Sequence, residues 1–308
     1  MGSLYKQIYR YTRPRAFRHN ENLWPFTHIT RAASGEIRTL KYKGKTVPLV
    51  SLSALKNSAH GEVLLTATGP STRRIDFSRL PESVPVMGVN GAWFLSDTLR
   101  FSFYTIVDME FYDKQPDIIR SVIGQPDLVL FTTMHGIAKI YDRYPADLRC
   151  RLALIEDGCY KIYQPKVASS MMRQTYQHIE ALRFHPERQD ICFSTDIRHG
   201  VFDAGTVVYW SLQILAWLGF EPERPVRRQS EHESEADGEQ VLTWPQGNGW
   251  LAQQLVADDD RYAALGAALR ALPPQGAVTI ARGSSDHAAA YFAYLVMSRT
   301  GQLVTSLP

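Results

Sequence analysis

Residues 63–71 read VLLTATGPS, an apolar run that leads straight into a glycine-proline-serine turn. Such a run, followed by a turn, is typical of a buried strand in an α/β domain. Further apolar runs at 84–89, 101–107 and 128–132 predict three more strands, with connecting segments between them. This alternation predicts an α/β fold with a mostly parallel, Rossmann-like sheet over residues 61–220.

The 60 residues before this domain form a basic segment, which we expect to be an accessory edge. Residues 1–45 hold ten Lys or Arg against only Glu21 and Glu36. Residues 36–50 alternate around Gly44 and predict a short hairpin. The basic charge fits either a solvated edge or contact with an anionic membrane or a phosphorylated glycolipid.

The chain changes character twice after residue 204. Residues 205–218 have the apolar spacing of a buried helix. Residues 221–248 begin with a stretch that holds seven acids within 221–240 and predict a linker or boundary. Residues 249–308 then predict an incomplete α/β unit, with a strand at 277–281, a turn at 282–287 and a helix at 288–299.

Composition excludes several classes of protein. No apolar run approaches the roughly 20 residues of a bilayer span, and the N-terminus has no apolar signal region, so we expect a cytoplasmic protein. Peripheral contact with the inner membrane is the alternative location. Cys150, Cys159 and Cys192 lack CxxC spacing, which predicts free thiols rather than a disulfide framework or a metal site. A net charge of +3 gives no reason to expect nucleic acid as a partner.

The turn formed by Thr68, Gly69, Pro70 and Ser71 is the first candidate binding element. Glycine lacks the Cβ that would block a ligand, so backbone N–H groups and a hydroxyl can converge on a phosphate. The same residues also suit an ordinary β-turn.

The ends of the next two strands supply the other candidates in this region. Asn90 and Gly91 follow the second strand, and Asp108 follows the third. Ligands of parallel α/β sheets collect at the carboxyl ends of the strands, which places these residues beside the first turn. The pair Asp108 and Glu110 suits a divalent cation or a ribose hydroxyl, or is simply solvated.

The motifs TGPS (68–71), DFSRL (76–80), VNG (89–91) and the segment 193–220 resemble bacterial lipopolysaccharide core-biosynthesis glycosyltransferases of the Kdo transferase type. They resemble CMP-sialic acid sialyltransferases more distantly. The resemblance implies a GT-A-like fold and inverting, metal-independent transfer from a CMP-activated acid sugar to a glycolipid or oligosaccharide, without a further cofactor. It also implies that Gly69, Ser71 and Asn90 hold the phosphate and ribose, while Gly205 and Thr206 approach the base.

The catalytic half of that family pattern is not recognisable after residue 220. His199 is a candidate base because an unperturbed histidine titrates near neutrality, although a loop histidine is commonly structural. His135, in a turn after the fourth strand, is open to the same two interpretations.

Residues 250–308 resemble the start of a SIS domain, found in phosphosugar isomerases and aminotransferases, and the turn of Gly283, Ser284 and Ser285 carries that resemblance. It implies a phosphosugar site at a helix N-terminus. Because both family patterns break off, we expect a fusion of two truncated reading frames. The alternatives to a transferase are a phosphosugar-binding protein and a nucleotide-binding relic without turnover. A dinucleotide oxidoreductase is disfavoured because GxGxxG is absent.

Overall fold

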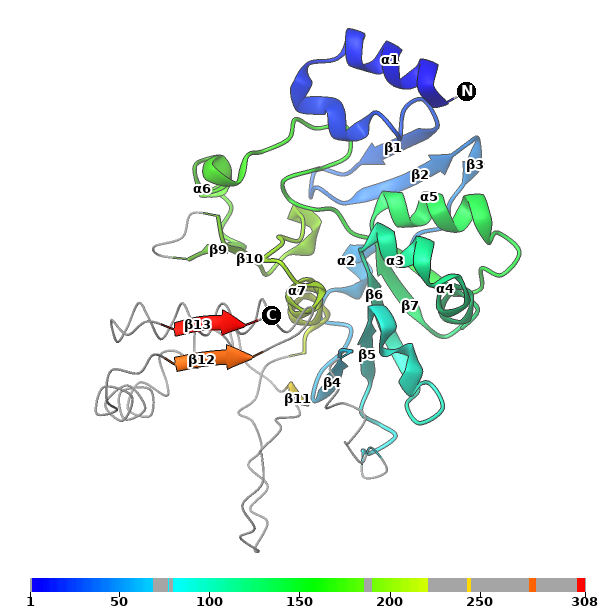
Figure 1. Ribbon diagram of the computed structural model, residues 1–308, viewed down its shortest axis with the longest axis vertical. Helices are drawn as coiled ribbons and strands as arrows, with labels where there is room; N and C mark the ends of the chain where they lie inside the picture. Colours follow the sequence, from blue (N-terminus) through cyan, green and yellow to red (C-terminus); the bar gives the residue numbers. More distant parts are fainter. Residues whose placement is uncertain are drawn as a thin grey trace, which may run out of the picture. The chain divides into compact units, whose positions relative to one another are not determined.

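The computed structural model describes residues 2–68, 77, 80–185 and 190–220, together with short strands at 243–244, 277–280 and 304–307 (Figure 1). The chain divides into two compact units, Met1–Gln246 and Gly247–Pro308. The first unit therefore includes the basic segment as well as the predicted α/β domain. Most of the predicted boundary at 221–248 lies outside the described residues.

A parallel sheet forms the centre of the first unit. Its parallel strands, in spatial order, are β4 (Val63–Thr66), β5 (Val86–Val89), β6 (Phe101–Ile106), β7 (Val129–Thr132) and β8 (Arg151–Leu154). The short strand β11 (Thr243–Trp244) pairs antiparallel with β4. The four strands predicted from the sequence are confirmed, and so is the α/β class with a mostly parallel sheet.

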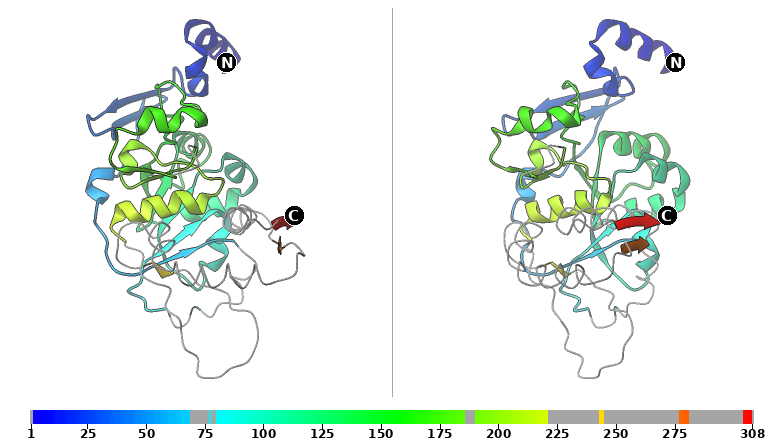
Figure 2. Two further views of the ribbon diagram at one scale, coloured as in Figure 1. Left: turned by 90° about the vertical axis from the view of Figure 1, so that its left-hand side faces the viewer. Right: turned by 60° about the vertical axis from the view of Figure 1, so that its left-hand side comes forward.

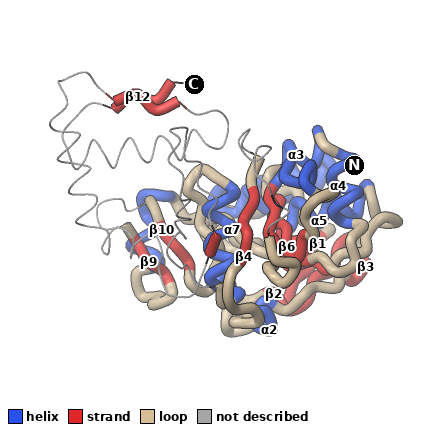
Figure 3. The backbone as a smooth tube through the Cα atoms, turned by 90° about the horizontal axis from the view of Figure 1, so that it is seen from below, coloured by secondary structure: helices blue, strands red, loops and turns tan. Residues whose placement is uncertain are grey.

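Most of the segments that connect these strands are helical. They are η4 (Asn90–Leu95), α3 (Met109–Lys114), α4 (Pro116–Ile123) and α5 (Met134–Arg143). Trp93 of η4 stacks on Phe101 at 5.4 Å between ring centroids, while Phe103 faces Phe220 beyond α7 (Val207–Leu218) at 6.0 Å. Figure 3 shows α3, α4 and α5 on one side of the strands and α7 on the other.

The strand order of this sheet differs from that of a doubly wound fold. A doubly wound sheet reverses its order at a switch point, which opens a crevice for ligands. The described strands β4 to β8 instead follow one another in sequence order. Right-handed crossovers then place the connecting helices on a single face, and among the described helices α7 covers the opposite face of β5 and β6.

Helix α7 is buried around most of its circumference, which explains its continuous apolar sequence. Thr206 caps its N-terminus, and Gly219 ends it in the left-handed conformation. Both the oxygen and the nitrogen of the buried Gln213 side chain form hydrogen bonds. Its Oε1 accepts the backbone N–H groups of Ser194 and Phe202, both at 3.0 Å, and its Nε2 donates to the carbonyl of Phe202 at 2.8 Å.

The N-terminal segment folds onto the same unit. Helices α1 (Gly2–Thr12) and η1 (Arg15–Asn20) precede an antiparallel sheet of β1 (Thr27–Arg31), β2 (Ile37–Tyr42) and β3 (Lys45–Thr46), and Figure 2 shows α1 above this sheet in both views. The hairpin predicted around Gly44 is confirmed. The N–H of Val50 donates to the carbonyl of Leu152 at 2.8 Å, which joins the segment to the outer edge of β8. Helix α2 (Leu52–Leu55) follows.

A small cluster lies between β8 and α7 in the sequence. It comprises η5 (Ser169–Met171), α6 (Met172–Tyr176), β9 (Leu182–Phe184), β10 (Cys192–Ser194) and η6 (Ile197–His199). Strands β9 and β10 pair antiparallel. The three cysteines are free, as predicted, and burial raises the pKa of Cys150 and Cys192 to about 12.

In the second unit, β12 (Ala277–Ile280) pairs parallel with β13 (Val304–Leu307). The strand predicted at 277–281 is confirmed. Gly283, Ser284 and Ser285, and the helix predicted at 288–299, lie outside the described residues. No helix in the described part of either unit has the length and apolarity needed to cross a bilayer.

Candidate functional site

The carboxyl ends of β4 and β5 bring two of the predicted elements together. Thr66 pairs with Gly88 in the register, so Thr68 and Asn90 leave the sheet side by side. A Cβ placed on Gly91 would lie 3.1 Å from Cγ2 of Thr68, which shows how closely the two turns approach. Gly69, Pro70 and Ser71 of the first turn lie outside the described residues.

Asn90 has two unusual features at this edge. Its backbone is left-handed, with φ of 45°, and its carbonyl accepts a hydrogen bond from the Tyr104 hydroxyl at 2.7 Å. Its side-chain Oδ1 is buried and has no hydrogen-bond partner in the described part of the chain. Strained backbone and unsatisfied buried polar atoms are concentrated at binding sites, because a ligand can satisfy them.

Asp108 lies at the end of β6 and caps helix α3. Its Oδ1 accepts the backbone N–H of Glu110 at 2.8 Å. Glu110 instead pairs with Lys114 at 2.6 Å on the exposed surface. The two acids therefore do not converge, and no described residue forms a hydrogen bond with Oδ2 of Asp108. No group of three or more potential metal-ligating side chains occurs among the described residues.

Gly205 and Thr206 form the N-terminus of α7. Gly205 has φ of 86°, and its N–H donates to Oδ1 of Asp203 at 2.9 Å. The Oγ1 of Thr206 accepts the N–H of Val208 at 3.3 Å. The other end of α7 lies at the amino ends of the strands, because the N–H of Ala59, before β4, donates to the carbonyl of Leu218 at 2.9 Å. The helix N-terminus is therefore directed toward the carboxyl edge.

His199 is held in a charged cluster on η6. Its Nε2 lies 3.9 Å from Oδ2 of Asp196, whose carboxylate is mainly engaged by Arg198 at 2.6 Å. Burial lowers the pKa of His199, and the opposing charge of Asp196 only partly offsets this. Burial also lowers the pKa of His135, in the first turn of α5. Both imidazoles therefore favour the neutral form that a base requires.

The segment after β8 contains a carboxylate that the sequence prediction did not include. The side-chain Oδ1 of Asp157 accepts the backbone N–H of Cys159 at 2.7 Å. The backbone of Asp157 forms a parallel β-bridge with that of Val201. Burial raises the pKa of Asp157 to about 6, with a further increase from the negative charge of Asp203. A carboxylate with a pKa near neutrality at a sheet edge is well suited to proton transfer.

Two further charged groups surround this segment. Glu156 is buried and accepts both Arg31 Nη2, at 2.8 Å, and the backbone N–H of Ile162, at 2.9 Å. Lys161 is only 7% exposed and forms no ion pair with any described residue. Its ammonium lies 5.5 Å from the centre of the Tyr176 ring, and burial lowers its pKa. The negative charge of Glu156 partly offsets this lowering of the Lys161 pKa.

A signal for this segment was present in the sequence. Residues 152–158 read LALIEDG, an apolar run followed by two acids and a glycine, which repeats the strand-then-turn pattern of residues 63–71.

Comparison of the chain with protein-family models, curated proteins and solved structures gives no match.

Proposed function

We propose that the chain is a glycosyltransferase of bacterial lipopolysaccharide or surface-glycan assembly, with a GT-A-like first unit. It transfers a CMP-activated acid sugar of the Kdo or sialic acid class to a glycolipid or oligosaccharide, with inversion and without a metal. The observation that carries the proposal is Asn90, whose buried Oδ1 has no hydrogen-bond partner among the described residues and lies beside Thr68 and Gly91 at the carboxyl edge. A nucleotide hydroxyl at this position would supply the missing donor.

The second support for the proposal is that two side chains, those of His199 and Asp157, are suited to proton transfer. In an inverting transfer the acceptor hydroxyl attacks the anomeric carbon, CMP leaves, and a base takes the hydroxyl proton. His199 is the base expected from the sequence, and its pKa is lowered. Asp157, with a pKa of about 6, is the second candidate. The positive charge of Lys161, on the same segment as Asp157, would stabilise the negative charge that develops on the phosphate of the departing CMP.

Binding of CMP tests the proposal directly. The melting temperature is measured with CMP, CDP, UDP and fructose 6-phosphate, since a ligand that binds the native state raises it. We expect cytidine nucleotides to stabilise the protein. A response to none of the cytidine nucleotides would refute the proposal.

Asn90→Asp is the matched test of the site. The substitution keeps the size of the side chain and tolerates a left-handed backbone, but it places a negative charge beside the nucleotide phosphate. We expect the stabilisation by CMP to disappear. Asn57→Asp is the control, because Asn57 is exposed and also left-handed, with φ of 51°, at the opposite end of the sheet.

The phosphosugar alternative is favoured by one observation, the parallel pairing of β12 with β13 expected for a strand-helix-strand unit. Stabilisation by fructose 6-phosphate alone would support this alternative. A nucleotide-binding relic predicts stabilisation by CMP without transfer from a CMP-sugar.

A further inference from the structure

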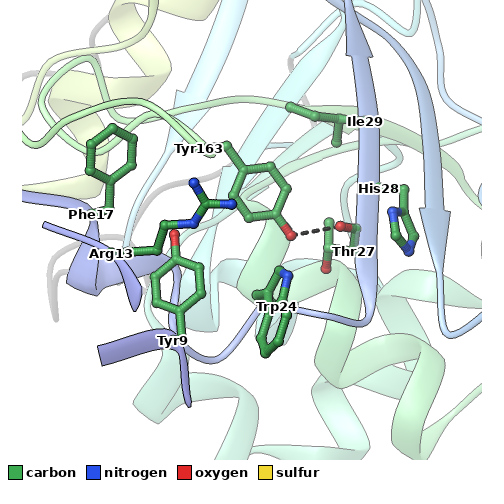
Figure 4. A pocket seen from close by; sticks show the side chains of 8 residues that line it. All are labelled: Tyr9, Arg13, Phe17, Trp24, Thr27, His28, Ile29 and Tyr163. Atoms are coloured by element: carbon green, nitrogen blue, oxygen red, sulfur yellow. Dashed lines mark hydrogen bonds between the residues drawn. The ribbon is translucent and has the colours of Figure 1, made fainter. Parts of the chain in front are cut away.

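A pocket of about 350 Å³ lies in the N-terminal part of the first unit, and Figure 4 shows the residues that line it. Its walls come from α1, η1, β1 and the segment after β8. Ligand pockets of this size are mostly aromatic or apolar and carry a few placed polar groups. The residues that carry the argument are Tyr9, Trp24, Tyr163, Arg13 and Thr27.

The aromatic walls of this pocket are fixed in place. The rings of Tyr9 and Trp24 contact each other at 5.9 Å between centroids. Tyr163 has a left-handed backbone, with φ of 57°, and its hydroxyl donates to the carbonyl of Thr27 at 2.6 Å. The N–H of Tyr163 also donates to Oδ1 of Asn20 at 3.1 Å. These contacts hold the rings as rigid flat surfaces, onto which the C–H face of a sugar can pack.

Arg13 supplies an anion-binding group at the wall of this pocket. Its guanidinium forms no ion pair with any described residue, and Figure 4 shows it among the aromatic rings. Its neighbour Arg10, in contrast, is neutralised by Glu21 at 2.6 Å. A free guanidinium binds a carboxylate or phosphate through two parallel hydrogen bonds.

Thr27 supplies a second polar group, and it is independent of the first. The residue is 2% exposed, and its Oγ1 has no hydrogen-bond partner in the part of the chain that the structure describes. Buried hydroxyls are normally paired, so the unpaired hydroxyl of a residue that lines a pocket points to a ligand with hydroxyl groups. A sugar ring has such groups.

We infer that this pocket binds a sugar that carries a carboxylate or phosphate, with the ring against the aromatic walls and the anion on Arg13. Tyr163 belongs to the segment that also contains Asp157, which connects the pocket to the carboxyl edge. The bound sugar is then part of the acceptor, and this role rests on the transferase function proposed above. The binding itself does not depend on that function.

The test is a ligand-observed nuclear magnetic resonance titration of the full chain with glucuronic acid, glucose 6-phosphate and glucose. We expect the two acidic sugars to bind about tenfold or more tightly than glucose, because hydrogen bonds to a charged group are stronger than neutral ones. Equal affinity for all three sugars would overturn the inference.

Two variants locate the binding in this pocket. Arg13→Gln should weaken binding of glucuronic acid about tenfold, whereas Arg15→Gln, a control at an exposed arginine outside the pocket, should not. Thr27→Val keeps the shape of the side chain and should weaken binding while the melting temperature stays level or rises. An unchanged affinity in Arg13→Gln, or a lower melting temperature with unchanged affinity in Thr27→Val, would overturn it.

Repeating the titration with saturating CMP separates this inference from the proposed function. We expect glucuronic acid to bind equally well, since the donor lies at the sheet edge. Competition between the two ligands would assign the pocket to the nucleotide and overturn the acceptor role. Failure of CMP to bind would refute the transferase proposal but would leave the sugar affinity of the pocket measurable.

Discussion

Asp157 makes the stability of the protein depend on pH in an unusual direction. Its pKa is about 6 in the folded chain against 3.8 for an ordinary aspartate. Between these values the folded state holds a proton that the unfolded state has lost, so the free energy of unfolding falls as the pH rises. The loss runs from about pH 4 and nears completion as the pH rises through the folded pKa of about 6.

The size of the effect follows from the shift. Two pKa units correspond to roughly 3 kcal/mol, at 1.36 kcal/mol per unit. Asp157→Asn removes the charge but keeps the oxygen that accepts the N–H of Cys159. The variant should therefore be more stable than the wild type by on the order of 2 to 3 kcal/mol at pH 8, a gain of roughly 5 to 10 °C in melting temperature for a unit of this size.

The assay is the melting temperature of both proteins from pH 4 to pH 8.5. We expect the two curves to meet near pH 4 and to separate as the pH rises. Asp127→Asn is the control, because the Asp127 side chain is 76% exposed in its pair with Arg100 and the change should cost less than about 1 kcal/mol at any pH. A gap that stays constant with pH, or a variant that is less stable at pH 8, would refute the reasoning.

Three further substitutions probe the supports of the carboxyl edge. Arg31→Met leaves Glu156 buried without its cation and should cost about 3 to 5 kcal/mol in urea unfolding, part of which Glu156→Leu in the same chain should restore. In Gly158→Ala the new Cβ would lie 2.4 Å from the Phe202 ring, so we expect a loss of about 1 to 3 kcal/mol, and an unchanged unfolding midpoint would contradict this close packing. Thr206→Ala removes the cap of α7 and should cost about 1 kcal/mol, with Thr206→Ser, which keeps the hydroxyl, close to wild type in the same measurement.

The sequence was sufficient to predict the strands whose apolar runs are uninterrupted. The runs at 63–67, 84–89, 101–107 and 128–132 became β4 to β7, and the run at 205–218 became α7, because both patterns are set by burial. Strand β8 was missed although LALIEDG carries the same signal. Helix α1 was missed because its buried face consists of tyrosines such as Tyr9, whose packing on Trp24 is not visible as a simple apolar period.

The candidate site was harder to predict than the strands. Asn90 could be placed at a sheet edge from its position after a strand, but the lack of a partner for its Oδ1 among the described residues depends on three-dimensional packing. The raised pKa of Asp157 has the same origin, since it comes from burial and from Asp203, 46 positions later in the chain. The strand order could not be predicted either. An apolar run identifies a strand, but it does not show which other strand lies beside it in the sheet.

The amide of Gln213 has a consequence for how this part of the molecule opens. One side chain of α7 bonds the backbone N–H groups of both Ser194 and Phe202. Those two amides can exchange with deuterium only when the helix releases them, so the segment that carries His199 and the helix behave as one cooperative unit. Slow fluctuations at the carboxyl edge are thereby tied to the fluctuations of a buried helix.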